Sequence, residues 1–351
     1  MKLLDLFSGI GGFHKGFEKA GFEFDWVGFS DIDKYASAVY KYRYPDAKEL
    51  GDITSIRPER DLPDNIDILC GGFPCQAFSV AGRRKGFEDT RGTLFFEIAR
   101  ILRHFRDTKK PIPYFVLENV KGLLSHDDGR TFAIIYRVLT DIGYTVECQL
   151  LNTRWVLPQN RERIYIVGHF GTGSGCKVFP IGENGSSYRT NKINIIGTTL
   201  NTGAKGTNSR HWVYDNDGLL GALSATDYKQ PKQIKIPEAT KKGYAEAKVG
   251  DSINLSVPNS KTRRGRVGKG EAQTLDTGMQ QYTIDKTAIR RLTPVECMRL
   301  QGFPDDWNEK GMMDGKVVDM SDTQRYKQAG NAVSVPIVSM VAERIKYGKQ
   351  K

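Results

Sequence analysis

The sequence predicts an α/β fold, in which a larger domain has a mostly parallel twisted sheet and a smaller irregular domain is inserted into it. Three observations predict this. Short apolar runs alternate with helical patterns up to about residue 170, helical patterns return after residue 289, and the segment between them is basic and rich in glycine. Strand–helix alternation is typical of parallel sheets with helices on both faces.

The expected elements follow in chain order. Apolar runs predict strands at 3–7, 24–29, 66–73, 113–120, 146–152 and 163–170, and helical spacing predicts helices at 13–20, 94–105, 131–144 and 336–345. Thr293 and Glu296 form a capping box with Pro294 at the first helical position, so a further helix begins there and ends near Gly302.

The charge is concentrated in the middle of the chain. Of 351 residues, 52 are Lys or Arg and 41 are Asp or Glu, a formal net charge of +11. Residues 171–289 carry 17 basic and 10 acidic side chains and 16 of the 37 glycines. Such a segment favours an inserted module that meets a polyanion. A solvated, poorly structured insertion is the alternative.

Several classes of protein are excluded by the composition. No stretch approaches 18 uninterrupted apolar residues, so we expect no membrane-spanning helix. Asp5 interrupts the apolar start, which argues against a secretory signal. The five cysteines contain no C-x-x-C pair and have no His at ligand spacing, so we expect neither disulfides nor a metal site. We therefore predict a soluble intracellular protein.

A glycine-rich turn follows the first predicted strand. Phe7-Ser8-Gly9-Ile10-Gly11-Gly12 places small residues where a backbone approaches a ligand. Asp31 ends the second strand, where a carboxylate accepts ribose hydroxyls, and Asp52 suits an adenine amino group. No G-x-G-x-x-G pattern and no P-loop lysine is present. An adenosine ligand without a phosphate cradle fits best; S-adenosylmethionine is such a ligand, and NAD is the competitor.

A cysteine follows the third predicted strand, at 66–73. Cys75 lies on a turn after Gly71-Gly72, before a loop that contains Arg83, Arg84 and Lys85. A thiol beside cations at such an edge has a depressed pKa and is nucleophilic. A buried core cysteine is the alternative interpretation, and it is the one we expect for Cys70.

Ionisable side chains also end two later strands. Glu118 and Asn119 end the run 113–120, where the carboxylate would project into the same crevice. Gln159, Arg161 and Arg163 share one face, because strand residues two apart point the same way. Thiolate, carboxylate and guanidinium around one adenosine pocket suit a heteroaromatic substrate that needs nucleophilic activation.

These blocks resemble the motifs of C5-cytosine-specific DNA methyltransferases of the bacterial and phage restriction–modification type. The matching blocks run in the family's order: LDLFSGIGGF, GDI, GGFPCQAFS, DTRGTLFFEIARIL, LENV, QNRERIYIVG, RRLTPVECMRLQGFPDDW and QAGNAVSVPIV. The resemblance implies a Rossmann-like class I methyltransferase domain over 1–170 and 289–351, whose last helix returns beside the first. It also implies a target-recognition domain over 171–288.

The resemblance implies a role for each catalytic residue. Cys75 attacks C6 of a cytosine that has been extruded from the duplex. Glu118 holds and protonates N3, and Arg163 stabilises O2 and helps orient the thiolate. Arg161 meets the DNA backbone, and Asn119 fixes the turn that positions the nucleophile loop.

The resemblance also implies binding residues. The pocket for S-adenosylmethionine is lined by Phe7, Ser8, Gly9, Gly11, Gly12, Asp31, Ile32, Asp52, Ile53, Pro74, Leu94, Asn331 and Ala332. Asp31 departs from the more usual glutamate at the ribose position. The DNA contacts are Gln76, Ser79, Arg83, Arg84, Arg263, Arg264, Arg266 and Thr274. Each of the three arginines at 263–266 either reads guanine or meets phosphates.

The implied partners are double-stranded DNA and a cognate restriction endonuclease, for a monomer that works in the cytoplasm on the nucleoid. Three alternatives stay open: a tRNA-methylating relative, a DNA-binding protein that has lost activity, and a dinucleotide oxidoreductase. The long glycine-rich insert disfavours the first, and intact Cys75, Glu118 and Arg163 disfavour the second.

Overall fold

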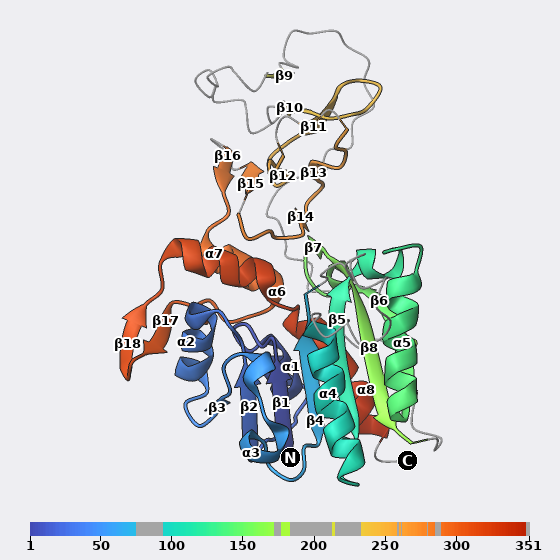
Figure 1. Cartoon of the computed structure of the whole chain (residues 1–351). Coiled ribbons are helices and arrows are strands. Elements are labelled where there is room, and N and C mark those ends of the chain that lie inside the picture. Colours follow the sequence, from blue (N-terminus) through green and yellow to red (C-terminus); the bar gives the residue numbers. More distant parts are fainter. Residues whose placement is uncertain are drawn as a thin grey trace.

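The computed structural model describes residues 1–74, 94–171, 177–182, 213–214, 233–257, 260, 262–278, 280–284 and 289–348. Figure 1 shows a larger domain, built around one sheet, and a smaller domain above it. No helix among the described residues is long and apolar enough to cross a membrane.

A seven-stranded sheet forms the centre of the larger domain. Its order is β3 (Lys48–Glu49), β2 (Trp26–Ser30), β1 (Lys2–Leu6), β4 (Ile68–Gly72), β5 (Tyr114–Val120), β8 (Glu162–Phe170) and β6 (Tyr144–Asn152). The first five strands pair in parallel, and β8 runs antiparallel to both β5 and β6. The predicted α/β class with a mostly parallel sheet is confirmed.

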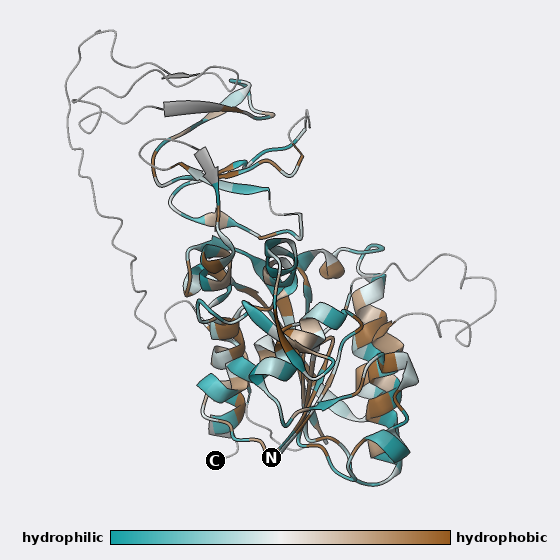
Figure 2. Cartoon of the chain, turned by 90° about the vertical axis from the view of Figure 1, so that its left-hand side faces the viewer, coloured by the Kyte–Doolittle hydropathy of each residue, from teal (hydrophilic) through white to brown (hydrophobic). Residues whose placement is uncertain are grey.

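Helices cover both faces of the sheet (Figures 1 and 2). On one face, α4 (Leu94–Asp107) and α5 (Arg130–Ile142) pack on side chains such as Leu69 and Phe115. On the other face, α1 (Gly12–Lys19) lies beside α8 (Val335–Gly348) and packs over Ile68 and Cys70. The expected return of the last helix beside the first is therefore confirmed, and Cys70 is a fully buried core residue.

Local signals in the sequence determine the helix ends. At α6 (Pro294–Gln301), the Thr293 hydroxyl accepts a hydrogen bond from the Glu296 amide, and the Glu296 carboxylate accepts from the Thr293 amide. Gly302 ends the helix in the left-handed region, at φ 81°. Both the capping box and the end of α6 at Gly302 are as predicted. The helix predicted at 131–144 ends earlier, because Gly143 adopts φ 112° and the chain enters β6.

Other elements carry weaker signals and were not predicted. They are α2 (Lys34–Arg43), α3 (Pro58–Asp61), α7 (Asp322–Asn331), the hairpin of β17 (Lys310–Met313) and β18 (Lys316–Asp319), and the short helices at Ile53–Ser55, Lys121–Leu124 and Thr153–Trp155. α7 is mostly polar and packs only one end into the core, so apolar periodicity does not reveal it.

The smaller domain consists of short strands. One sheet has β11 (Tyr244–Ala247), β10 (Gln233–Pro237) and β9 (Val213–Tyr214); another has β13 (Val267–Gly268), β12 (Ser252–Asn254), β15 (Gln281–Ile284) and β16 (Ile289–Arg291). The two domains are joined by backbone pairing of β7 (Gln159–Asn160) with β14 (Ala272–Gln273).

The domain boundaries differ from those predicted from the sequence. Residues 177–182 were expected in the smaller domain, but Val178, Phe179 and Ile181 pack into the core of the larger one, and the side chains of Glu147 and Gln149 bind their backbone. At the other end, β16 begins at residue 289 and pairs with β15 in the smaller domain. Apolar patterning could not place these boundaries, because tertiary contacts decide them.

Candidate active site

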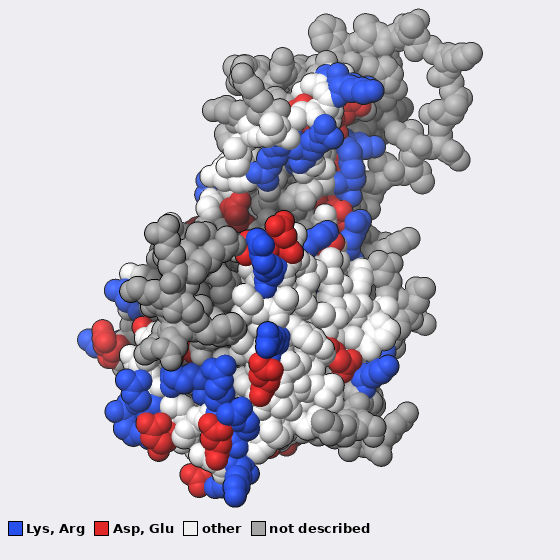
Figure 3. All heavy atoms as spheres, turned by 45° about the vertical axis from the view of Figure 1, so that its right-hand side comes forward, with Lys and Arg blue, Asp and Glu red and all other residues white. Residues whose placement is uncertain are grey.

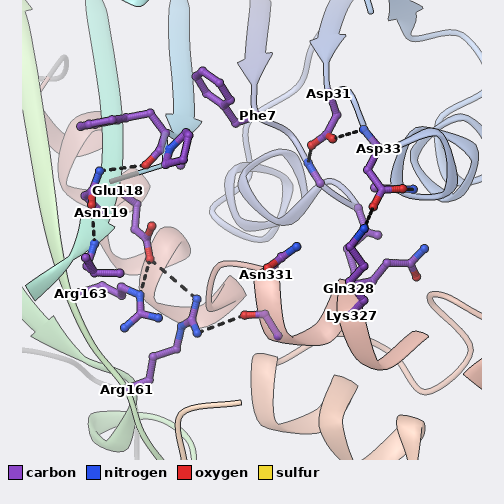
Figure 4. A pocket seen from close by; sticks show the side chains of 18 residues that line it. Phe7, Asp31, Asp33, Glu118, Asn119, Arg161, Arg163, Lys327, Gln328 and Asn331 are labelled. Carbon is purple, nitrogen blue, oxygen red and sulfur yellow. Dashed lines mark hydrogen bonds and ion pairs between the residues drawn. The ribbon is translucent and has the colours of Figure 1, made fainter. Parts of the chain in front are cut away.

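A cavity of about 400 Å³ opens at the carboxyl ends of β1, β2, β4 and β5 (Figure 4). Its walls bring together residues that were predicted for the cofactor and residues that were predicted for catalysis. The lining contains Phe7, Gly9, Ile10, Asp31, Asp33, Ala36, Gly72, Phe73, Pro74, Glu118, Asn119, Val120, Arg161, Arg163, Lys327, Gln328, Gly330 and Asn331.

The turn after β1 is held by the end of β2. Phe7 adopts φ 52°, a left-handed conformation that is uncommon for a bulky residue, and Gly9 and Gly11 also have positive φ. The Gly9 amide donates to the Asp31 carboxylate at 2.8 Å, and the Asp33 amide donates to its other oxygen at 2.8 Å. Burial raises the pKa of Asp31. This carboxylate thus fixes the turn in addition to facing the cavity.

Other residues predicted for the cofactor are not in the walls of this cavity. Ile32, which stands in the chain between the lining residues Asp31 and Asp33, is 77% exposed. The Asp52 carboxylate caps the short helix at Ile53–Ser55, and Ile53 is buried. Gly12 begins α1 in close contact with Val333, where a Cβ would lie 2.6 Å from Cγ2 of that valine.

The remaining residues in this group are Ser8, Gly11, Leu94 and Ala332. The Ser8 hydroxyl is buried and finds no hydrogen-bond partner among the described residues. Ala332 is also buried, at the end of α7.

An ion pair that the sequence did not predict closes the cofactor side of the cavity. Lys327 of α7 lies 2.7 Å from Asp33, and Asp33 caps α2 through its other oxygen. Because the partners are 294 residues apart, no local pattern could have revealed the pair. The one sequence signal that could have pointed to this residue is the position of Asp33 directly before α2, where an acidic side chain caps a helix.

The acid and the two arginines meet at the other side (Figure 4). Glu118 is mostly buried, and its Oε1 lies 3.1 Å from Arg163 Nε and 4.0 Å from Arg161 Nη2. No aligned hydrogen bond reaches that oxygen within the described residues. At this buried oxygen the carboxylate is therefore paired electrostatically with the two guanidinium groups, without an aligned hydrogen bond from either.

Asn119 connects this cluster to the next strand end. Its side-chain amide donates to the Phe73 carbonyl at 2.9 Å, and its oxygen accepts from the Val120 amide at 2.8 Å. Phe73 and Pro74 line the cavity immediately before position 75. This bond is the kind of contact that the predicted role of Asn119 requires. Cys75, Gln76, Ser79, Arg83 and Arg84 lie outside the described residues.

A buried polar chain lies under the glycine turn. The fully buried Asp5 carboxyl accepts from Cys70 Sγ at 3.5 Å and from the Tyr40 hydroxyl at 3.3 Å. Burial raises the pKa of Asp5 to about 8, so the group is largely protonated at neutral pH. His14 Nδ1 lies 3.1 Å from the same hydroxyl, and burial lowers the pKa of His14 to about 4.

The predicted DNA-reading arginines have different environments. Arg264 is exposed, and Arg263 is half-buried with Nη1 at 2.7 Å from the Ser256 hydroxyl. Arg266 is 1% exposed and donates to the Ser260 carbonyl. We therefore do not retain Arg266 as a base-reading residue, because its guanidinium is inside the smaller domain. Thr274 donates to the Asn160 carbonyl at the joint between the domains.

Positive charge gathers on the smaller domain, as Figure 3 shows. Exposed Lys241, Lys242, Arg264 and Lys269 are among the described residues that contribute to it. No group of three or more His, Cys, Asp or Glu side chains that could hold a metal ion occurs within the described part of the chain.

Comparisons with known proteins agree with this geometry. Residues 1–347 match the family described as C-5 cytosine-specific DNA methylase. The chain is 38% identical to the type II methyltransferase M.SsoII of Shigella sonnei, over 98% of this chain and 79% of that protein. It is 39% identical to the type II methyltransferase M.NgoBI of Neisseria gonorrhoeae, over 96% and 90%. The solved structure of the S. pombe Dnmt2 methyltransferase is similar in fold, with a TM-score of 0.59, 18% identity and full coverage of both chains.

Proposed function

Because the chain belongs to the C-5 cytosine-specific DNA methylase family and is a DNA cytosine-5 methyltransferase, we propose that it methylates one cytosine of a short target sequence in double-stranded DNA. The observation that carries the proposal is the Glu118–Arg163 pair in the same cavity as the glycine turn. The chain enters that cavity at Pro74, immediately before Cys75.

The proposed methyl donor is S-adenosylmethionine, and the residues fit it. Asp31 presents a carboxylate where a ribose would lie, Ile32 offers an exposed apolar side chain, and Asn331 faces the cavity from α7. Asp52 and Ile53 stand beside them for the adenine. When bound, the donor supplies an electrophilic methyl group on a sulfonium.

In the proposed reaction Cys75 acts on the pyrimidine ring. Its thiolate forms a bond to C6 while Glu118 delivers a proton to N3, so that the ring becomes an enamine with a nucleophilic C5. C5 takes the methyl group, and S-adenosylhomocysteine is the product that remains. The C5 proton then passes to water, the thiolate leaves C6 and N3 returns its proton to Glu118, which restores the aromatic ring. Arg163, already against Glu118, stabilises charge at O2.

The cytosine has to leave the duplex to reach this cavity. Extrusion costs on the order of a few kcal/mol for unstacking and unpairing. We propose that Gln76, Ser79, Arg83 and Arg84 contact the extruded strand. On the smaller domain, Arg263, Arg264 and Thr274 contact the flanking DNA, and we assign residues 183–291 of the sequence to the target-recognition domain.

The relatives suggest a biological setting. M.SsoII and M.NgoBI are named as type II methyltransferases. We propose that this enzyme, acting as a monomer on DNA in the cytoplasm, protects host DNA against a cognate restriction endonuclease.

The proposal is tested in two stages. Bisulfite sequencing of DNA from cells that express the protein reports both activity and target. An oligonucleotide with 5-fluorocytosine at that target is then incubated with protein and S-adenosylmethionine, and a denaturation-resistant adduct is expected. Cys75→Ser abolishes the adduct and retains duplex binding. Methylated tRNA without methylated DNA, or turnover by Cys75→Ser at the wild-type rate, would overturn the proposal.

A further inference from the structure

The end of α7 contacts three parts of the molecule that are far apart in sequence. Gly330 and Asn331 line the cavity. The carbonyl oxygens of Gly330 and Ala332 accept hydrogen bonds from Arg161. The backbone of Asp276 and Thr277, in the smaller domain, lies against Gly330. Cofactor pocket, catalytic acid and smaller domain therefore meet at one short segment.

Arg161 connects this segment to the catalytic acid. Its side chain is 3% exposed, Nη2 donates to the Ala332 carbonyl at 3.0 Å, and Nη1 donates to the Gly330 carbonyl at 3.4 Å. Nη2 also lies 4.0 Å from Glu118 Oε1. The prediction that Arg161 meets the DNA backbone does not agree with this burial. A planar guanidinium holds several acceptors in one fixed geometry, which suits a bridging role.

Gly330 makes the contact with the smaller domain possible. A Cβ at this position would lie 2.7 Å from the Asp276 carbonyl oxygen and 3.0 Å from the Thr277 amide nitrogen, closer than real side chains approach backbone. Thr274 stands two residues before Asp276, and its hydroxyl donates a hydrogen bond to the Asn160 carbonyl at 3.0 Å. The segment 274–277 thus touches the residue immediately before Arg161 and also the end of α7, whose carbonyl oxygens accept hydrogen bonds from Arg161.

We infer that Arg161 is a positioning residue that makes the geometry of Glu118 depend on how the segment 274–277 of the smaller domain is seated against Gly330. The inference rests on the proposed function. Movement of the smaller domain displaces the Gly330 carbonyl, Arg161 follows its acceptors, and Glu118 loses one of its two cationic neighbours. A wrong target sequence that seats the smaller domain poorly is then penalised in the chemical step and not only in binding.

The central experiment compares Arg161→Met, Arg161→Lys and Gly330→Ala with the wild type. Single-turnover rates are measured with radiolabelled S-adenosylmethionine on the target duplex and on a duplex with one changed flanking base pair. For Arg161→Met we expect the rate to fall about tenfold or more, as for small misplacements of catalytic groups, with KM for DNA and for the cofactor nearly unchanged.

The other variants separate the contribution of the Arg161 side chain from that of the contact at Gly330. Arg161→Lys keeps the charge and loses the fixed fork, so its rate falls less than that of Arg161→Met while both KM values stay near those of the wild type. Gly330→Ala keeps the side chains of Arg161 and Glu118 unaltered but forces the segment 274–277 away, so the rate on the target falls more than the rate on the altered duplex, where this segment is already poorly seated. The ratio of the two rates therefore decreases. Arg137→Met, at an exposed arginine on α5, is the matched control and stays at the wild-type rate.

The outcomes are distinguishable from failure of the proposed function. If the wild type forms the 5-fluorocytosine adduct, but Arg161→Met keeps the wild-type rate, the inference is wrong and the function stands. An unchanged rate ratio in Gly330→Ala contradicts the inference in the same way, and it decides the matter should Arg161→Met fail to fold. If the wild type itself forms no adduct, the proposed function fails first.

Discussion

The larger and smaller domains differ in what holds them together. In the larger domain, two extensive apolar clusters pack helices on the two faces of the sheet. A third joins α2, α6 and α7 and also takes in Leu275 of the smaller domain. In the described part of the smaller domain, one cluster has four buried members, Ile236, Ala247, Ile253 and Ile284. The remainder is short strands and side chain–backbone hydrogen bonds. A catalytic site needs side chains fixed by a packed scaffold, whereas a small core leaves a DNA-reading surface free to differ between relatives.

The largest expected effect tests this difference in packing. Ile253→Ala opens a cavity in the only cluster of the smaller domain that the structure describes and costs about 2–4 kcal/mol. We expect the smaller domain to unfold at a lower temperature and lose specific DNA binding, while the affinity for S-adenosylhomocysteine changes less than about twofold because the cofactor pocket is in the other domain. Calorimetry with and without that ligand measures both. Ile98→Ala in α4 is the control and should lower the main transition of the larger domain.

A smaller effect separates two ways in which the smaller domain could use its arginines. Each side chain makes one hydrogen bond, Arg263 to the Ser256 hydroxyl and Arg264 to the Ala239 carbonyl. Arg263 is half-buried, which suits a base contact, whereas Arg264 is exposed, which suits a phosphate. We expect Arg263→Ala to cost about 1–3 kcal/mol of discrimination between target and altered sequence. Arg264→Ala should weaken binding to the target and to the altered sequence alike. The slope of the affinity against salt concentration should then correspond to about one fewer ion released on binding. Titrations at several salt concentrations decide, and the reverse assignment would follow if the two variants exchanged behaviour.

The third prediction concerns the packed core under the glycine turn. Asp5 has a pKa of about 8 in the folded chain and 3.8 as its ordinary value, so the folded state holds a proton that the unfolded state releases. Its contribution to stability is present below pH 4 and is lost as the pH rises through 8. We expect the free energy of unfolding to decline between pH 6.5 and 8.5, by at most about 1.4 kcal/mol per pH unit. Asp5→Asn should remove that slope.

His14 sets the lower limit of the pH range in which this slope can be measured. Its pKa is lowered to about 4 from an ordinary 6.5, so its contribution is present above pH 6.5 and is lost as the pH falls through 4. Below pH 6.5 the two groups oppose each other, and only above it does Asp5 act alone. Denaturant unfolding at fixed pH values gives the slope, and an equal slope in Asp5→Asn would show that another group is responsible.

The smallest expected effect lies at the mouth of the cofactor side. Lys327 is 45% exposed, so its pair with Asp33 contributes little, and we expect Lys327→Gln to weaken binding of S-adenosylhomocysteine by about two- to fivefold. Asp33→Asn keeps the helix cap, because asparagine caps as well as aspartate, and should have the same effect. The double variant should be no weaker than either single variant. Calorimetric titration at low and high salt checks this, since additive losses would exclude a shared interaction.

The catalytic acid and the turn could be predicted from the sequence for a simple reason. Parallel strands carry their carboxyl ends to one edge, so Gly9, Asp31 and Glu118 had to converge once their strands were recognised. Apolar periodicity did not predict α7, because few of its side chains are buried. The pair of Asp33 with Lys327 could not be predicted from any local pattern, because its partners lie far apart in the chain. Arg266 was misjudged because a basic run shows charge and does not show which member is buried.

The sequence by itself determined the α/β class, the strand-end chemistry and the family, because these depend on local periodicity and on motifs read in order. Only the tertiary structure decided that Arg161 is buried against the carbonyls of Gly330 and Ala332, and that residues 177–182 belong to the larger domain. Both depend on which distant surfaces fit together. That fit is a property of packing in three dimensions, and no spacing along the chain encodes it.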